Sequence, residues 1–183
     1  MSSTLTEQDR LVLLQTAREA IGARLALRSP HYPAPGADLS AHCGAFVTLK
    51  IDGRLRGCIG HITSPRPLVE TIKEVALSSA FEDPRFPPLR PEEWGRVRLE
   101  VSVLSPFEVI TDVNRIEVGV HGIMIRQGSH SGLLLPQVAA EQGWDRDTFL
   151  SHTCLKAGLP RDAWIRQQTR IEIFSAQVFG EKE

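Results

Sequence analysis

The sequence predicts an α+β fold in which helices pack against a mainly antiparallel sheet. Strand-like and helix-like segments are interspersed, and they lack the regular strand-helix-strand order of a parallel sheet. Alternation is clearest at 96–104, where Val97, Leu99, Val101 and Val103 share one face. The 183 residues, of which 42% are hydrophobic, suffice for one domain or for one domain with a small subdomain.

The N-terminal segment predicts a helix followed by an irregular connection. Thr6 can serve as the N-cap because an acid, Asp9, stands three residues later. Apolar residues then recur at helical spacing to about Arg28. The segment 29–41 is rich in proline and contains a glycine, which predicts an irregular connection.

A hairpin and a second helix are expected next. Residues 46–51 and 54–59 alternate as strands, and Asp52-Gly53 between them predicts a tight turn with positive φ. Ser64 is the expected N-cap of the second helix, with Pro65 at its first position. The inner face of this helix is expected to carry Leu68, Ile72, Val75 and Ser79.

The rest of the chain predicts a rigid turn, short strands and one more helix. The proline-rich segment Asp83 to Pro88 ends the second helix. The segment 118–135 predicts short strands separated by His121-Gly122 and by a turn at 128–132. A helix and a strand complete the chain, at 148–157 and 170–178.

Charge and hydropathy bear on the partners of this chain. The net charge of −1 gives no general attraction to nucleic acid or to an anionic membrane, and no apolar run approaches the length of a membrane span. We therefore expect neither partner. Of the 21 basic residues, 17 are arginine, whose planar guanidinium suits carboxylates and phosphates. A small anionic ligand is one explanation of this bias, and genomic base composition is the other.

The three cysteines, Cys43, Cys58 and Cys154, form an odd set. The chain does not open with a basic and then apolar signal segment. We therefore expect free thiols in a cytoplasmic protein.

The segment Leu55-Arg56-Gly57-Cys58-Ile59-Gly60 is the strongest candidate for a functional site. Glycine weakens a strand interior, so Gly57 and Gly60 indicate a bulge or a place where another group approaches the backbone closely. In a regular strand Arg56 and Cys58 share one face, and a cation that close lowers the pKa of a thiol and favours the nucleophilic thiolate. The alternative is a small buried cysteine in a tight turn.

Four further residues are candidates for binding or proton transfer. Asp83 and Arg85 could bind each other within the turn, or Arg85 could bind an anionic ligand. Glu100 lies on the face of its strand opposite the valines, where it faces solvent or lines a cleft. His121 is a candidate acid or base, although a histidine in a hairpin often has no functional role.

No metal ion or cofactor is expected. Each cysteine has a histidine nearby, but His152 and Cys154 point about 200° apart on a helix and cannot bind one ion together. The chain contains no Cys-x-x-Cys, no His-Glu-x-x-His and no phosphate-binding glycine loop. A site assembled from Cys58, His61 and a distant histidine is the remaining alternative.

The hexapeptide Leu55–Gly60 resembles the signature of the AMMECR (AMME chromosomal region) domain family. Four more segments resemble the same family in the same order, and the resemblance covers about Ala45 to Phe179. They are Ala80 with Asp83-Pro84-Arg85-Phe86, Leu99-Glu100-Val101-Ser102-Val103-Leu104-Ser105, Leu134-Leu135-Pro136-Gln137-Val138-Ala139, and Phe149-Leu150 with Cys154-Leu155-Lys156-Ala157-Gly158-Leu159.

The resemblance implies a larger and a smaller subdomain, with the hexapeptide near the groove between them. It also implies partners, because family members are encoded beside, or fused to, a Memo-type protein related to extradiol dioxygenases and a radical S-adenosylmethionine (SAM) protein. These three components form the AmmeMemoRadiSam system. The resemblance implies no particular reaction.

Two hypotheses about function follow. In the first, the chain is an enzyme or catalytic component that acts through Cys58, with Arg56 activating the thiol or binding an anionic substrate. Glu100 or His121 would then carry the proton. In the second, the chain is a non-catalytic module that binds a ligand or a partner protein in the same groove.

Overall fold

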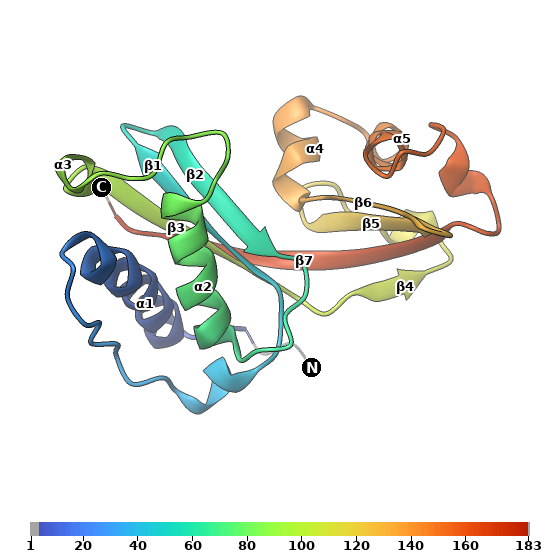
Figure 1. Cartoon of the computed structure of the whole chain (residues 1–183). Coiled ribbons are helices and arrows are strands. Elements are labelled where there is room, and N and C mark those ends of the chain that lie inside the picture. The colour runs from blue at the N-terminus through green and yellow to red at the C-terminus, as the bar shows by residue number, and fades with distance from the viewer. Residues whose placement is uncertain (1–3, 183) are drawn as a thin grey trace. The chain divides into compact units, whose positions relative to one another are not determined.

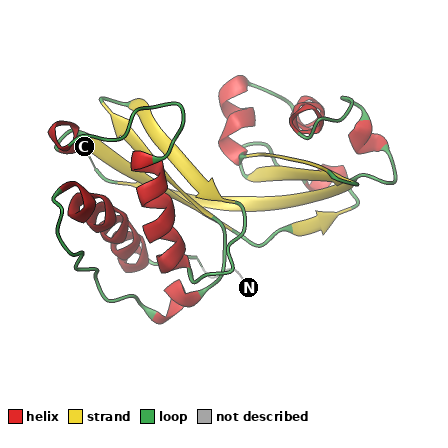
Figure 2. Ribbon diagram, viewed as in Figure 1, coloured by secondary structure: helices red, strands yellow, loops and turns green. Residues whose placement is uncertain are grey.

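The computed structural model describes residues 4–182, apart from the side chains of residues 37 and 38, and it divides into two units (Figure 1). The first unit comprises the residues up to Leu104 and those from Gln177 onward, and the second comprises Ser105–Ala176. Each unit contains both helices and strands (Figure 2). The strand pairings described below are antiparallel, so the predicted α+β fold with a mainly antiparallel sheet is confirmed.

The sheet of the first unit contains β1 (Ala45–Ile51), β2 (Arg54–His61) and β3 (Val97–Leu104). The strand order is β2-β1-β3, so β2 forms an edge. On the far side of β3, the N–H of Glu181 donates a hydrogen bond to the carbonyl oxygen of Leu99 (2.9 Å). The strand with the clearest alternation therefore lies in the interior of the sheet, as predicted.

One face of this sheet forms the core of the first unit. Val47, Leu49, Leu99 and Val101 are buried on it. The helices α1 (Glu7–Leu25) and α2 (Leu68–Phe81) pack against the sheet, and the four residues expected on the inner face of α2 are all buried. Burial of each large aliphatic side chain stabilises the unit by about 1.5–3 kcal/mol.

Local signals in the sequence fix two of these elements. The N–H of Asp9 donates to Oγ1 of Thr6 (3.1 Å) and the N–H of Thr6 donates to Oδ2 of Asp9 (3.0 Å), so the expected capping box begins α1. Asp52 and Gly53 have φ values of 50° and 74° and form the turn between β1 and β2. The connection before β1 is irregular as expected, except for the short 3-10 helix η1 (Ala37–Ser40).

The second helix begins later than the sequence predicts. Its first residue is Leu68 and its N-cap is Pro67, whereas Pro65 was expected at the first position. Proline disfavours helical backbone in the residue before it, so Pro67 prevents Arg66 from continuing a helix that starts at Pro65. Ser64 instead stabilises the preceding bend, because its Oγ accepts a hydrogen bond from the N–H of Arg66 (3.1 Å).

The second unit is built on four strands and two helices. The strands pair in the order β4-β7-β5-β6. Their bounds are β4 Glu108–Ile110, β5 His121–Gln127, β6 His130–Leu134 and β7 Arg170–Gly180, of which the residues to Ala176 belong to this unit. The helices are α4 (Pro136–Gln142) and α5 (Arg146–Lys156), and α5 contributes Phe149 and Leu150 to the core. The helix and the strand expected at the C-terminal end are thereby confirmed.

Two expectations about the second unit are wrong in detail. His121-Gly122 does not separate strands but begins β5, where the two residues pair with Ser175 and Phe174 of β7. Gly122 is suited to that position because a β-carbon there would overlap the ring of Phe174. The turn expected at 128–132 is also shorter, because β6 begins at His130.

Several short elements have no counterpart in the sequence analysis. They are β4, α4, α3 (Pro91–Trp94), η1 and the 3-10 helices η2 (Val113–Arg115) and η3 (Ala163–Ile165). Each is too short to show a periodic pattern of apolar residues. Within the described residues, no helix is long and apolar enough to cross a membrane.

Candidate functional site

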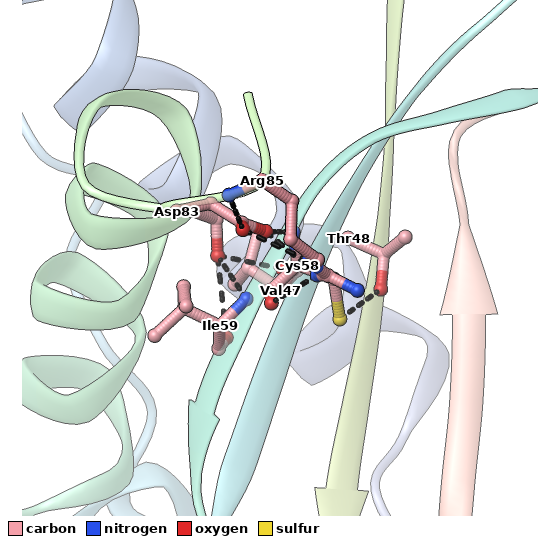
Figure 3. Close-up of polar contacts among 7 residues, drawn as sticks. Val47, Thr48, Cys58, Ile59, Asp83 and Arg85 are labelled. Carbon is pink, nitrogen blue, oxygen red and sulfur yellow. Dashed lines mark hydrogen bonds and ion pairs between the residues drawn. The ribbon is translucent and has the colours of Figure 1, made fainter. Parts of the chain in front are cut away.

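The hexapeptide Leu55–Gly60 lies in β2, the edge strand of the first unit (Figure 3). An edge strand leaves backbone N–H and C=O groups without a partner strand. At Cys58, side chains from the turn after α2 bind both groups. The N–H of Cys58 donates to Oδ2 of Asp83 (2.9 Å), and its carbonyl oxygen accepts a hydrogen bond from Nη2 of Arg85 (3.2 Å). Two side chains thus take the place of a neighbouring strand.

Asp83 and Arg85 also bind each other, which was one of the two expected alternatives. Nε of Arg85 donates to Oδ1 (2.9 Å) and Nη2 donates to Oδ2 (2.7 Å), and the backbone N–H of Arg85 also donates to Oδ1 (3.1 Å). Asp83 is only 4% exposed. The Arg85 guanidinium, together with the N–H groups of Cys58 and Arg85, holds the pKa of the Asp83 carboxyl well below its usual range. The carboxylate therefore stays charged although it is buried.

Ser79, near the C-terminal end of α2, provides a second attachment beside Cys58. Its Oγ accepts a hydrogen bond from the N–H of Ile59 (2.8 Å) and donates one to the carbonyl oxygen of Val47 (2.7 Å) (Figure 3). One hydroxyl therefore binds β1 and β2 to the same helix. The peptide around Cys58 is held both by this hydroxyl and by the Asp83–Arg85 pair.

Arg56 and Cys58 do not lie on a regular strand, because β2 is bulged there. The pairing of β1 with β2 slips by one residue between Leu55 and Gly57, so Arg56 is the extra residue of a β-bulge. The guanidinium of Arg56 donates to both carboxylate oxygens of Glu93 (2.8 and 3.0 Å). The expectation that Arg56 stands beside the thiol on a regular strand is therefore wrong.

Gly57 and Gly60 mark close approaches, which was one of the two expected reasons for glycine. Neither residue has a positive φ. A β-carbon on Gly57 would overlap the carbonyl oxygen of Ser79, and one on Gly60 would overlap the ring of Phe46 and the carbonyl oxygen of Ala45. The approaching groups belong to the protein itself, and ligand binding at either glycine stays a prediction.

The thiol of Cys58 lies on the outer face of the sheet, opposite the core. Thr48 is directly across on β1, and its hydroxyl donates a hydrogen bond to Sγ (3.2 Å) (Figure 3). Glu100 of β3 pairs with Thr48 from the other side, so the three residues form one row across three strands. The Glu100 carboxylate binds Nζ of Lys50 (2.9 Å). The row brings together a thiol, a hydroxyl and a carboxylate, all partly exposed.

The remaining candidates lie apart from this row. His121 belongs to the second unit, where its Nδ1 accepts a hydrogen bond from the N–H of Glu117 (3.0 Å). His61 lies with its Nε2 3.1 Å from Oε1 of Glu74. In the part of the chain that the structure describes, no three His, Cys, Asp or Glu side chains form a group that could hold a metal ion.

Thr48 and Ser79 are site residues that sequence reasoning did not identify. Ser79 was expected on the inner face of its helix, but its hydrogen bonds depend on how the helix meets the strands. A regular hairpin with a two-residue turn at Asp52-Gly53 would place Thr48 opposite Gly57. The bulge adds one residue to β2, so Thr48 lies opposite Cys58 instead.

Comparison with known proteins agrees with the resemblance of the hexapeptide. A family model described as AMMECR1 matches residues 14–179. Protein MK0488 of Methanopyrus kandleri is 47% identical over 193 aligned positions, which cover 100% of this chain and 93% of that protein. Protein MJ0810 of Methanocaldococcus jannaschii is 45% identical over 148 positions, or 76% of this chain and 73% of that protein.

A solved structure is also similar. The crystal structure of the uncharacterized protein PH0010 from Pyrococcus horikoshii matches with a TM-score of 0.82 and 42% sequence identity. The match covers 93% of this chain and 90% of that chain.

The close approach at Gly57 predicts a specific loss of stability. Gly57→Ala should lower the free energy of unfolding by about 1–3 kcal/mol, because the new methyl group must push α2 away from β2. Gly95→Ala is the matched control, since Gly95 has a φ of −62° and nothing lies within 4 Å of an added β-carbon. Denaturant unfolding should show no loss for the control. Equal losses for the two variants would contradict the close approach.

The buried carboxylate of Asp83 predicts a dependence of stability on pH. Asp83→Asn should lower the free energy of unfolding at neutral pH by about 1–3 kcal/mol, because it breaks the ion pair with Arg85. The pKa of Asp83 in the folded protein lies below its unfolded value of about 3.9. Its contribution is therefore complete above about pH 5 and is lost as the pH falls below about 4. Unfolding curves of wild type and variant should converge in acid.

Asp52→Asn controls for the loss of a surface charge. Asp52 pairs with Arg96, but its side chain is 66% exposed. Such exposed pairs contribute about 0–1 kcal/mol, so this variant should differ little from wild type at any pH. A difference between wild type and Asp83→Asn that stayed constant into acid would contradict the buried ion pair.

Proposed function

The chain belongs to the AMMECR1 family, and we propose that Cys58 acts in it as a nucleophilic thiol on the outer face of the first unit. One observation carries this proposal. The backbone of Cys58 is bound on both its N–H and its C=O by the Asp83–Arg85 pair, while the residue is partly exposed and its sulfur accepts a hydrogen bond from Thr48. A rigid backbone with an accessible side chain is the arrangement that a catalytic nucleophile requires.

In this proposal Cys58 reacts as a thiolate. The thiolate, not the thiol, is the nucleophilic form of cysteine. A hydroxyl that donates to the sulfur, as Thr48 does, solvates the charged form. The guanidinium of Arg85 donates a hydrogen bond to the carbonyl oxygen of Cys58. We therefore assign to Arg85 part of the role that the sequence analysis gave to Arg56.

Glu100 is the proposed proton carrier. It lies two strands from Cys58, and strands are spaced about 4.8 Å apart, so its carboxylate does not reach the sulfur directly. Thr48 lies between them and bears a hydroxyl that both accepts and donates hydrogen bonds. We propose that the Thr48 hydroxyl, turned toward Glu100, gives its proton to that carboxylate as it takes the thiol proton, and that it then donates to the thiolate, as it donates to Sγ in this structure. His121 of the second unit is the alternative carrier.

The proposed activity is that of one component in a system of several proteins. The proposed partners are a Memo-type protein and a radical SAM protein, which the resemblance of the sequence implies. In this proposal the chain supplies the nucleophilic thiol, and the two partner proteins carry out the other steps of the reaction. Its substrate would be an electrophilic group that the Cys58 sulfur attacks to form a covalent intermediate.

A second candidate function, the non-catalytic binding module, is favoured by a specific feature. A pocket of about 560 Å³ opens beside the hexapeptide, around Leu55 and Arg56. Arg54 and Arg96 also line it, as do Glu93 and Asp52, which pair with Arg56 and Arg96, so a small anionic ligand would bind chiefly through Arg54. In this case the hexapeptide shapes a binding site, and Cys58 performs no covalent step.

Thiol reactivity distinguishes the two functions. Burial raises the pKa of the Cys43 and Cys154 thiols, which makes these cysteines internal controls. At neutral pH, iodoacetamide should modify Cys58 at least about tenfold faster than either control, as measured by mass spectrometry of timed samples. The Thr48→Val variant should reduce this advantage, because it removes the hydroxyl that solvates the thiolate. Equal rates at the three cysteines would contradict a nucleophilic Cys58 and favour the binding module.

A further inference from the structure

A second groove lies in the first unit, between α1 and the C-terminal residues of the chain. Its volume is about 710 Å³, within the range of small-molecule sites. Leu11 and Leu14 of α1 line one side, and Phe179 lines the other. The charged side chains that line the same groove are those of Arg10, Arg18 and Lys182 and the acids Glu7 and Glu181. We call this site the α1 groove.

The residues that α1 presents to the groove are distinct from those that it buries. Arg10, Leu11, Leu14 and Arg18 follow helical spacing on one side of the helix. The core side is formed by other residues, Val12, Leu13, Ala17, Ala20 and Ile21. Leu11 is 47% exposed, although it is large and apolar. Leu14 and Phe179 also pack against the core of the unit, whereas Leu11 extends the apolar surface outward into the groove.

The two arginines of the groove differ in their bonding. Arg18 is already paired, because it binds the carboxylate of Glu181 and donates from Nη2 to the carbonyl oxygen of Val97 (2.8 Å). Arg10 instead lies over the ring of Phe179 (5.8 Å), and its buried Nε has no hydrogen-bond partner among the described residues. A buried donor without an acceptor is unfavourable by about 1–3 kcal/mol. Arg10 is therefore the arginine of this groove that no carboxylate binds among the described residues, and a ligand in the groove would have to bind its Nη atoms, because Nε is buried.

We propose that the α1 groove binds a small organic acid with an apolar body. The carboxylate would bind the guanidinium of Arg10, whose planar fork matches two carboxylate oxygens. The apolar body would lie against Leu11, Leu14 and Phe179, which water contacts in the absence of a ligand. A small multivalent anion such as phosphate fits less well, because it would leave the apolar wall uncovered and meets only one free guanidinium. This site is independent of Cys58 and of the function proposed for it.

Three eight-carbon probes test the proposal on the intact chain. Octanoate, octan-1-ol and octylammonium have the same apolar body and differ in the charge of the head group. Isothermal titration calorimetry should show octanoate binding at least about tenfold more tightly than octan-1-ol, which is the scale of one charge-assisted hydrogen bond. Octylammonium should bind more weakly still, because Arg10 repels it.

Variants of two arginines of α1 test whether octanoate binds in the α1 groove. Arg10→Gln should weaken octanoate binding about tenfold or more and leave octan-1-ol binding nearly unchanged. Arg24→Gln is the matched control, because Arg24 also lies on α1 over an aromatic ring, that of Phe81 (5.6 Å), but does not line the groove. It should not change the affinity for either probe. Leu11→Gln should weaken both probes, because it removes part of the apolar wall.

Three results would overturn the proposal. One is octanoate binding no tighter than octan-1-ol binding, and another is an equal effect of Arg10→Gln and Arg24→Gln. The third is self-association that Leu11→Gln abolishes, as measured by analytical ultracentrifugation. That result would mean that a second copy of the chain, not a small acid, covers the apolar surface. Circular dichroism of each variant confirms that it is folded before its affinity is compared.

Discussion

The ion pair between Asp83 and Arg85 is the interaction on which the site depends. It binds the N–H and the C=O of Cys58 at the edge of the sheet, where no further strand is available. A buried carboxylate is unfavourable unless it is paired and hydrogen-bonded, and Asp83 receives hydrogen bonds from the side chain and N–H of Arg85 and from the N–H of Cys58. The pair therefore holds the turn after α2 and the central residue of the hexapeptide in one arrangement.

A second acid–arginine pair binds backbone groups of β3 in this sheet. The carboxylate of Glu181 accepts a hydrogen bond from the N–H of Leu99 (2.9 Å), and Arg18, which is paired with that carboxylate, donates to the carbonyl oxygen of Val97 (2.8 Å). An acid and an arginine thus bind backbone groups of a strand at two places in the first unit, at the edge strand β2 and at β3 just past the end of β7. At β3 the pair binds Glu181 of the C-terminal segment to the sheet. At β2 the pair holds Cys58, which is partly exposed.

Much of the fold could be predicted from local patterns, whereas the geometry of the site could not. The capping box at Thr6 and the turn at Asp52-Gly53 are local signals, and both elements formed where they were expected. The face on which Arg56 lies depends on a bulge, and nothing in the residues from Arg54 to Gly60 distinguishes a bulge from a tight packing contact. The two glycines allowed either explanation, and both features occur.

Long-range contacts account for the rest of what the sequence could not show. The bond between Asp83 and the N–H of Cys58 joins residues 25 positions apart, and it forms only because α2 returns the chain to the edge of β2. The position of Thr48 beside the sulfur follows only once the register of the bulged hairpin is known. The resemblance singled out the hexapeptide as the candidate site, and the contacts of that segment hold the backbone of a partly exposed cysteine between two glycines.

Hydrogen exchange at the amide of Cys58 tests this account most directly. If Asp83 binds that N–H in solution, the amide should exchange slowly although it points out from an edge strand, and Asp83→Ala should accelerate its exchange. The amide of Ile72, inside α2, should be far less affected by the same substitution, which separates local release from global unfolding. Rapid exchange of the Cys58 amide in the wild-type protein would contradict the account.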